Sequence, residues 1–120
     1  MNVRIEPPVA TEPVGERVRV IVGGEELVDT RQAVWLNESG RPPVLYFPLD
    51  DVRAGALVPT DETSSCGLKG DANYYSIRLN DGRVLENAVW QYGSPNDDVP
   101  ELANRVAFYP NHVDDFRMGD

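Results

Sequence analysis

The sequence predicts a small, mainly β domain of antiparallel strands with one short helix near the C-terminus. Three observations lead to this fold class. Short stretches rich in valine and tyrosine alternate between apolar and polar positions, as half-buried strands do. Ten prolines and ten glycines divide the 120 residues into many turns, which favours short strands over long helices. The expected strands also follow one another without intervening helices, unlike the pattern of a parallel α/β sheet.

The charge balance excludes several classes of partner. Eleven basic and twenty acidic residues give a formal net charge of −9. Such a surface repels nucleic-acid phosphates and anionic membranes, because binding to both depends on lysine and arginine. We therefore expect a protein that binds neither nucleic acid nor membrane. Separately, we expect a monomer or a homodimer.

The cysteine count and the hydropathy of the chain indicate a cytoplasmic setting. A single cysteine cannot form an intrachain disulfide. The first residues contain no apolar core of signal-peptide length. No stretch approaches the ~20 apolar residues that a membrane-spanning helix needs.

Proline and charge divide the chain into three expected parts. Residues 1–13 contain three prolines, which lack a backbone donor, so we expect an extended arm outside any sheet. Residues 14–113 form the single domain. Residues 114–120 are expected to be an acidic tail that frays.

The first two strands are expected at residues 17–22 and 25–30. Gly23 and Gly24 between them tolerate the positive φ angles of a two-residue hairpin turn. The first strand alternates strictly, so one face carries its three valines, Val18, Val20 and Val22.

Further short elements follow in the first half of the chain. Residues 31–38 continue extended, and residues 44–47 form a short strand after a proline-rich turn. One helical turn is expected within residues 49–54. Pro59 makes the edge of a sheet the expected place for residues 56–63.

The clearest hairpin spans residues 74–92. Its Asp81-Gly82 corner is typical of a two-residue type I′ turn, which would pair Leu79 with Val84. An apolar face, expected in the core, would then hold Tyr75, Ile77, Leu79, Val84, Glu86, Ala88, Trp90 and Tyr92. A polar face would hold Tyr74, Ser76, Arg78, Leu85, Asn87, Val89 and Gln91. The alternative is a three-residue loop with a glycine bulge, which slips the register by one and moves Glu86 and Trp90 to the polar side.

The C-terminal region carries the expected helix and the last strand. Asp98 and Glu101 have the spacing of a capping box, and Pro100 lies in the first turn, where its missing donor costs nothing. These features predict a helix of about two turns. Residues 106–109 are a strand that Pro110 stops.

Several strings in this order resemble a known family. They are S-S-C-G-L-K-G-D-A-N-Y-Y-S-I, L-E-N-A-V-W-Q-Y-G-S-P and V-A-F-Y, preceded by R-V-R-V, D-T-R and P-P-V-L-Y-F-P. Together they resemble the bacterial and fungal domain-of-unknown-function family 427 over about residues 14–113. The family also carries a nucleotidyltransferase-like label, for which the residues offer no support.

The resemblance implies a β-tent, in which two antiparallel sheets pack at an angle. Other β-tents include methionine sulfoxide reductase B and the ligand-binding domain of cereblon, which usually hold zinc with four cysteines. This chain has one cysteine, so the resemblance implies a domain without that metal site. Such relatives often use the polar face of one sheet for a small ligand. We therefore expect a small-molecule-binding domain that needs no metal and no cofactor.

Candidate ligand-binding residues lie in one glycine-bracketed loop and on the polar face of the hairpin. They are Cys66, Lys69, Tyr74, Ser76, Arg78 and Asn87. The loop lysine suits an anionic group, with glycine N–H groups helping. On the hairpin, a ring, a hydroxyl, an amide and a guanidinium could line a pocket. The alternative for the same hairpin residues is the wet face of an antiparallel sheet.

Two other functions stay open at this point. One is a cofactor-independent enzyme, in which Lys69 activates the thiol of Cys66 or Glu86 serves as an acid–base group. Against it, a free cysteine usually packs as a small hydrophobe, and the single histidine, His112, lies in the acidic C-terminal region. The other is a protein-interaction or self-association domain that uses exposed aromatic side chains.

Overall fold

The computed structural model describes residues 9–67, 69–97 and 99–120, and within them the chain is almost entirely β. Its strands are β1 (Val9–Pro13), β2 (Val18–Val22), β3 (Glu25–Thr30), β4 (Val34–Glu38), β5 (Val44–Pro48), β6 (Leu57–Cys66), β7 (Gly70–Arg78), β8 (Val84–Tyr92), β9 (Arg105–Phe108) and β10 (Asp115–Met118). Three single 3-10 turns accompany them: Leu49–Asp51, Pro100–Leu102 and Pro110–His112. The described residues contain no α-helix, so no helix there is long and apolar enough to cross a membrane.

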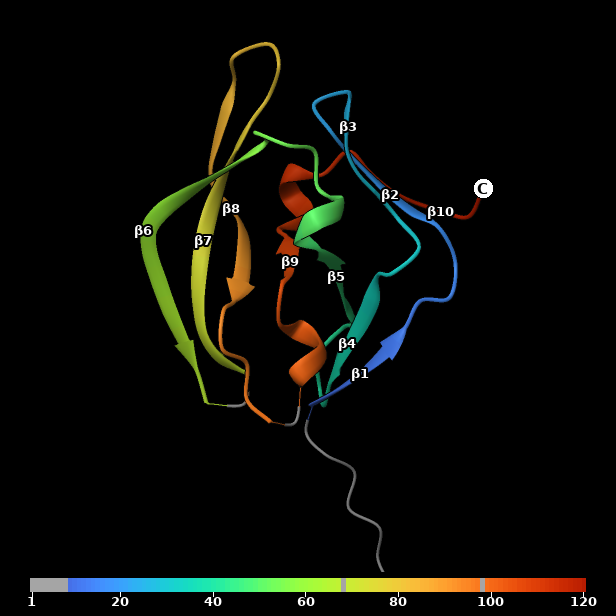
Figure 1. Ribbon diagram of the computed structural model, residues 1–120, viewed down its shortest axis with the longest axis vertical. Helices are drawn as coiled ribbons and strands as arrows, with labels where there is room; N and C mark the ends of the chain where they lie inside the picture. The colour runs from blue at the N-terminus through green and yellow to red at the C-terminus, as the bar shows by residue number, and fades with distance from the viewer. Residues whose placement is uncertain (1–8, 68, 98) are drawn as a thin grey trace, which may run out of the picture.

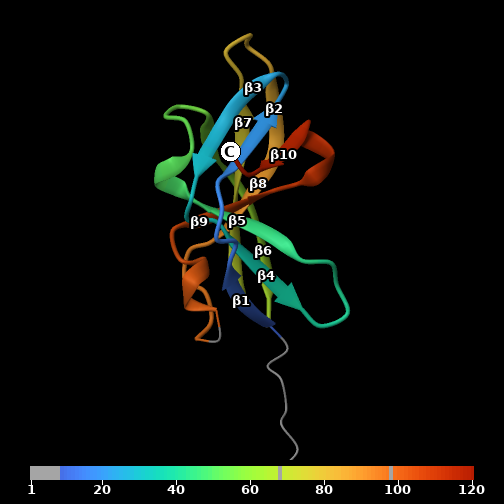
Figure 2. The ribbon, with the colours of Figure 1, turned by 90° about the vertical axis from the view of Figure 1, so that its right-hand side faces the viewer.

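The strands form two antiparallel sheets. The larger has seven strands in the order β1-β4-β5-β9-β8-β7-β6, and the smaller has three in the order β10-β2-β3. In Figure 1, β6, β7 and β8 form one wall and β2, β3 and β10 the other, with β5 and β9 between them. Figure 2 shows the small sheet in front of the upper part of the molecule, while β1 and β4 lie below it. The prediction of a mainly β, antiparallel domain is confirmed.

Two buried clusters lie on opposite faces of the large sheet. The first fills the space between the sheets and includes Phe47, Phe108 and the three valines of β2. The second surrounds Tyr46 and Ala107. Successive residues of a strand point to opposite faces, which is why Phe47 and its neighbour Tyr46 belong to different clusters. The large sheet is therefore buried on both sides near its middle.

The first hairpin agrees with its prediction. Gly23 and Gly24 have φ angles of 56° and 78° and connect β2 with β3. Val18, Val20 and Val22 are fully buried, as their alternation indicates. A β-bulge between Val20 and Ile21 shifts the register of this pair, which the alternation does not predict.

The two ends of the chain differ from expectation. Residues 9–13 are β1, which pairs with β4, and the expected arm at residues 1–8 lies outside the described residues. β1 lies at the edge of the large sheet and has a neighbouring strand on one side only. A proline is tolerated there because no second strand needs its missing backbone N–H. Residues 115–118 form β10, which pairs with β2, and Phe116 stacks on Phe47 with centroids 6.2 Å apart.

The expected C-terminal helix is wrong. Pro100–Leu102 makes a single 3-10 turn, and at Ala103 the backbone is already extended with ψ 134°. The capping residue Asp98 lies outside the described residues. Strand β9 explains the early end, because its pairing with both β5 and β8 requires an extended chain from Arg105 onward.

The register of the β7–β8 hairpin also differs from the favoured prediction. Leu79 N–H donates to the carbonyl of Arg83 at 2.9 Å, so the loop has three residues, and Gly82 has a φ of 93°. The three-residue alternative therefore holds near the loop. A second irregularity follows, because Ser76 of β7 lies opposite a three-residue stretch of β8, and pairing resumes at Tyr75 and Val89. As a result, two residues that were expected in the core lie on the surface: Val84 is 53% exposed, and Glu86 is also exposed.

Candidate functional site

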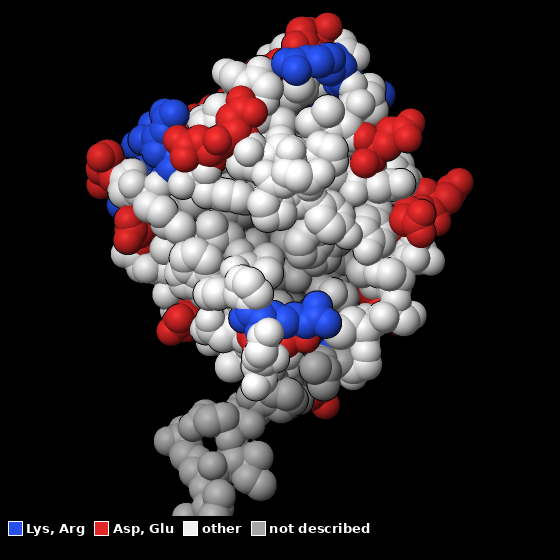
Figure 3. All heavy atoms as spheres, turned by 180° about the vertical axis from the view of Figure 1, so that it is seen from behind, with Lys and Arg blue, Asp and Glu red and all other residues white. Residues whose placement is uncertain are grey.

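A cavity with a volume of about 450 Å³ lies on the Tyr46 face of the large sheet. Its walls come from β4, β5, β8, the loop between β4 and β5, and the turn before β7. The lining residues are Leu36, Glu38, Arg41, Pro42, Pro43, Val44, Tyr46, Lys69, Trp90, Tyr92 and Pro110. In Figure 2 the loop between β4 and β5 projects to the right, which is the rear side of the molecule in the view of Figure 1. Figure 3 shows this rear side, where a hollowed, uncharged centre is surrounded by charged side chains.

A tight turn holds Lys69, the only lysine of the chain, at one side of this cavity. Lys69 N–H donates to the carbonyl of Cys66 at 3.3 Å, and the Lys69 carbonyl accepts the N–H of Asn96 at 3.0 Å. The next residue must be glycine, because a Cβ on Gly70 would lie 2.9 Å from the carbonyl oxygen of Ser94 and its φ is 116°. The turn therefore fixes the point from which the lysine side chain starts.

Glu38, at the end of β4, is the partner of Lys69. The Lys69 ammonium donates to Oε1 of Glu38 at 2.6 Å, and each of the two side chains is only 12% exposed. Arg41 approaches the other carboxylate oxygen at 3.6 Å and is 72% exposed. Two cations thus share one carboxylate, which leaves a local excess of positive charge in an acidic protein.

Three aromatic rings form a second wall of the cavity. Trp90 Nε1–H donates to the hydroxyl of Tyr46 at 2.9 Å, and the two rings meet edge to face with centroids 6.2 Å apart. Tyr92 lies beside Tyr46, and the Lys69 ammonium is 5.8 Å from the centroid of its ring. The Tyr46 hydroxyl accepts the bond from Trp90 and so keeps its own proton to donate.

Burial further favours the neutral form of the Tyr46 and Tyr92 hydroxyls, which is already the form of tyrosine at physiological pH. It raises the pKa of Tyr46 well above its usual value and raises the pKa of Tyr92 to about 12. Both groups are therefore hydrogen-bond donors at physiological pH. The cavity combines an aromatic wall with a few polar groups, most of which are donors.

The structure separates the residues that the sequence nominates. Lys69 lines the cavity, and half-buried Cys66 packs against the second buried cluster. Tyr74 also packs against that cluster, stacks on the ring of Tyr109 at 6.5 Å and shares a hydrogen bond with Ser64. These residues do not form one surface with the rest of the predicted polar face.

Ser76, Arg78 and Asn87 line a different, open groove of about 290 Å³, which shares no lining residue with the cavity. Two of them bind each other there: Asn87 N–H donates to Oγ of Ser76 at 3.1 Å. The hydroxyl of Thr60 donates to Oδ1 of Asn87 at 2.6 Å. Much of the groove's hydrogen-bonding capacity is therefore used within the protein.

The residues proposed for an enzyme are placed unfavourably. The Lys69 ammonium binds the carboxylate of Glu38, and Glu86 is exposed to solvent. Among residues 9–67, 69–97 and 99–120, no three His, Cys, Asp or Glu side chains gather in an arrangement that could hold a metal ion.

The sequence missed most of the cavity. The alternation places Trp90 and Tyr92 in the core, where Tyr92 is buried and Trp90 packs against the second cluster, but it does not indicate that both also line a cavity. No motif in the sequence marks Glu38, Arg41 or Tyr46 as functional. Lys69 is the exception, because its glycine-bracketed loop makes it a candidate in the sequence. The ion pair of Lys69 with Glu38 could not be predicted from any sequence motif, because the two residues are 31 positions apart.

This geometry defines a small, mainly β domain with an ion pair beside an aromatic cavity. The model of the family described as "Domain of unknown function (DUF427)" matches residues 10–119, and the chain belongs to this family. The resemblance noted in the sequence is thereby confirmed. No curated protein matches the chain.

Proposed function

We propose that this domain binds a small organic anion in the cavity between Lys69 and the rings of Tyr46, Trp90 and Tyr92, without a metal or a cofactor. The observation that carries the proposal is the carboxylate of Glu38, which two cations share beside an aromatic wall. We also propose that the two sheets form the β-tent implied by the family resemblance; the buried cluster between them supports this.

The size and composition of the cavity favour a small molecule. Small-molecule sites usually have volumes of about 300–1,000 Å³ and apolar walls with a few polar groups that fix orientation. The cavity, at about 450 Å³, lies within that range, and its walls are mostly apolar and aromatic. A flat or apolar ligand would bury its body against these rings.

The polar groups favour a ligand that accepts hydrogen bonds. Lys69 keeps N–H protons beyond the one given to Glu38, Arg41 is largely exposed, and Tyr46 has a proton to donate. Glu38 is the only acidic side chain among the lining residues, and it is already paired. A carboxylate or a similar anionic group matches this excess of donors and of positive charge.

Benzoate is a suitable probe, with benzylamine and benzyl alcohol as matched ligands of different charge. We expect isothermal titration calorimetry to detect benzoate and neither of the other two. Arg41→Gln should weaken benzoate about fivefold, which corresponds to about 1 kcal/mol for an exposed charge. Because Arg41 is exposed, this change should leave the melting temperature nearly unaltered.

Two further variants locate the ligand and test the sign of its charge. Arg78→Gln removes an exposed arginine from the groove and should leave benzoate binding unchanged. Glu38→Gln removes the carboxylate that competes for both cations, so it should tighten benzoate binding. Binding of benzylamine alone, or a loss of benzoate binding in Arg78→Gln but not in Arg41→Gln, would contradict the proposal.

A further inference from the structure

A second hollow adjoins the cavity and differs from it in character. It has a volume of about 230 Å³, and no charged side chain lies among the residues that line it. Its walls are built mainly from Trp35, Leu45, Phe108, Phe116 and Met118. Phe116 is held in place by stacking on Phe47 with an interplanar angle of 6°. The hollow is therefore a formed apolar site at the junction of the two sheets.

The two hollows lie on opposite faces of the large sheet, the cavity beside the Tyr46 cluster and the second hollow beside the Phe47 cluster, and they share part of their walls. Pro43, Val44 and Pro110 line both of them, so one boundary separates the cation-bearing cavity from the apolar hollow. Two of these three residues are prolines, which have no backbone N–H. The boundary thus presents few polar groups that an apolar chain would have to desolvate while crossing it.

The charges of the combined region are arranged asymmetrically. Lys69 and Arg41 lie on the side of the first cavity, and the far hollow offers only apolar contacts. Met118 lines the far hollow and is 40% exposed, so part of its apolar side chain faces solvent. This pattern complements a molecule with an anionic end and an apolar body.

We propose that the natural ligand is an amphipathic carboxylate, whose anionic group lies at Lys69 and Arg41 and whose apolar body extends past Pro43 into the hollow beside Trp35. This inference rests on the proposed function and specifies its ligand class. The apolar body would cover the exposed face of Met118 on binding. The free protein leaves this face open to solvent.

The two tryptophans of the chain provide a direct test, because Trp90 lines the first cavity and Trp35 lines the second hollow. Protein labelled with 5-fluorotryptophan should give two 19F resonances, which Trp35→Phe assigns. Benzoate should shift the Trp90 resonance alone. 6-Phenylhexanoate, which adds five methylene groups, should shift both and bind about tenfold more tightly, since buried methylene groups favour binding.

A charge at the mouth of the apolar hollow should change the affinity for one ligand and not for the other. Met118→Glu should abolish most of the roughly tenfold gain in affinity of 6-phenylhexanoate and leave benzoate binding unchanged. Val84→Glu is the matched control, because Val84 is another exposed apolar strand residue and lines neither hollow. It should affect neither ligand.

The outcomes distinguish the failure of this inference from that of the proposed function. If benzoate binds but the longer ligand gains nothing and leaves Trp35 unchanged, the extension into the second hollow is wrong and the anion site remains. If no carboxylate shifts Trp90, both proposals fail. If the Trp35 resonance depends on protein concentration alone, a second copy of the chain occupies the hollow and this inference is overturned.

Discussion

Asn87 shows how a single residue can decide what a strand presents to solvent. Its φ of 50° is a left-handed conformation that most residues adopt only at a cost. Its N–H donates to Ser76, and its side-chain oxygen accepts a hydrogen bond from Thr60. These contacts hold the irregular stretch of β8 that lies opposite Ser76. Asn87 therefore serves the fold of the hairpin, although its residue type suggested a ligand contact.

We predict that Asn87→Ala lowers the free energy of unfolding by about 1–2 kcal/mol, because alanine must adopt the left-handed conformation. Asn87→Gly should cost less, since glycine tolerates this φ and only the bond from Thr60 is lost. Urea unfolding measures both, with exposed Asn37→Ala as a control. Benzoate affinity should stay unchanged in Asn87→Gly. Loss of binding with retained stability would instead place Asn87 in the ligand site.

Only one of the two residues of the ion pair at the cavity could be predicted from the sequence. The single lysine could be recognised as a candidate because of its position in a glycine-bracketed loop. Its partner Glu38 could not, because that contact depends on bringing the end of β4 next to the turn before β7. No local pattern encodes such a long-range approach.

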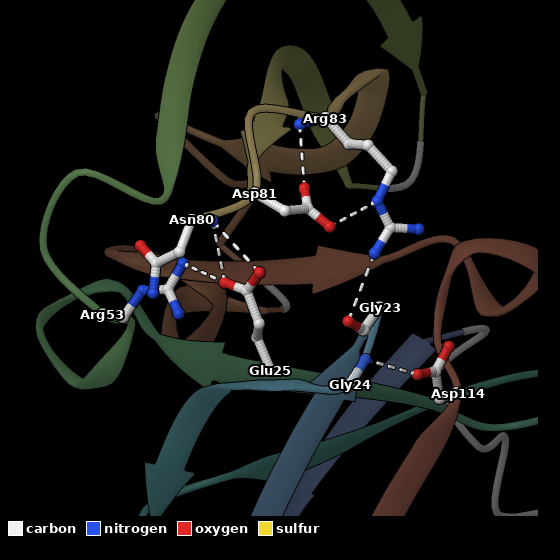
Figure 4. Close-up of polar contacts among 8 residues, drawn as sticks. All are labelled: Gly23, Gly24, Glu25, Arg53, Asn80, Asp81, Arg83 and Asp114. Atoms are coloured by element: carbon white, nitrogen blue, oxygen red, sulfur yellow. Dashed lines mark hydrogen bonds and ion pairs between the residues drawn. The ribbon is translucent and has the colours of Figure 1, made fainter.

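Among the elements, the β7–β8 loop is bound to the β2–β3 turn by a set of polar contacts, here called the clasp, which involves Gly23, Glu25, Arg53, Asn80 and Arg83. Figure 4 shows the contacts between them. The carboxylate of Glu25 accepts the N–H of Asn80 at 2.9 Å and pairs with Arg53, also at 2.9 Å. Arg83 donates to the carbonyl of Gly23 at 3.3 Å. A Cβ on Gly23 would lie 2.6 Å from the Leu79 side chain, which would have to shift.

This clasp explains why the Asp81-Gly82 corner misled the register prediction. The dipeptide is compatible with a two-residue loop and with a three-residue one. The Asp81 carboxylate accepts the N–H and Nε–H of Arg83, and Glu25 holds the N–H of Asn80, so the longer loop is stabilised from both sides. The second of these contacts comes from another sheet and is not visible in the hairpin sequence.

The clasp should weaken in acid. The N–H of Asn80 and the charge of Arg53 lower the pKa of Glu25, so the unfolded chain takes up this proton more readily than the folded one. The stabilisation is fully present above the ordinary glutamate pKa of about 4.3 and is lost as pH falls through the lower folded value.

We therefore predict that Glu25→Gln is less stable than the parent protein at pH 7 and that the difference narrows as pH falls below about 4.3. Urea unfolding at a series of pH values measures it. The neighbouring Glu26 approaches Arg19 only at 4.0 Å, so Glu26→Gln is the matched control and should show little difference at any pH. A constant gap down to pH 3 would show that the charge of Glu25 is not what stabilises the clasp.

At the scale of the whole molecule, strand order creates the cavity. The large sheet places β5 between β4 and β9, and β9 beside β8, so segments far apart in the sequence meet around Tyr46. Alternation and turn chemistry could predict most strands and the mainly β class. They could not predict which strands become neighbours, because pairing between distant strands depends on how well the whole core packs. The ends of the chain were misjudged for the same reason.

The most direct test of the proposed anion-binding cavity uses the single lysine. Protein labelled with 15N-lysine should show one lysine backbone amide resonance, that of Lys69, at the wall of the cavity. We predict that benzoate shifts this resonance to saturation, that benzylamine does not, and that Glu38→Gln reaches saturation at a lower benzoate concentration. A resonance that stays in place with benzoate, or that moves only with benzylamine, would contradict an anion-binding cavity.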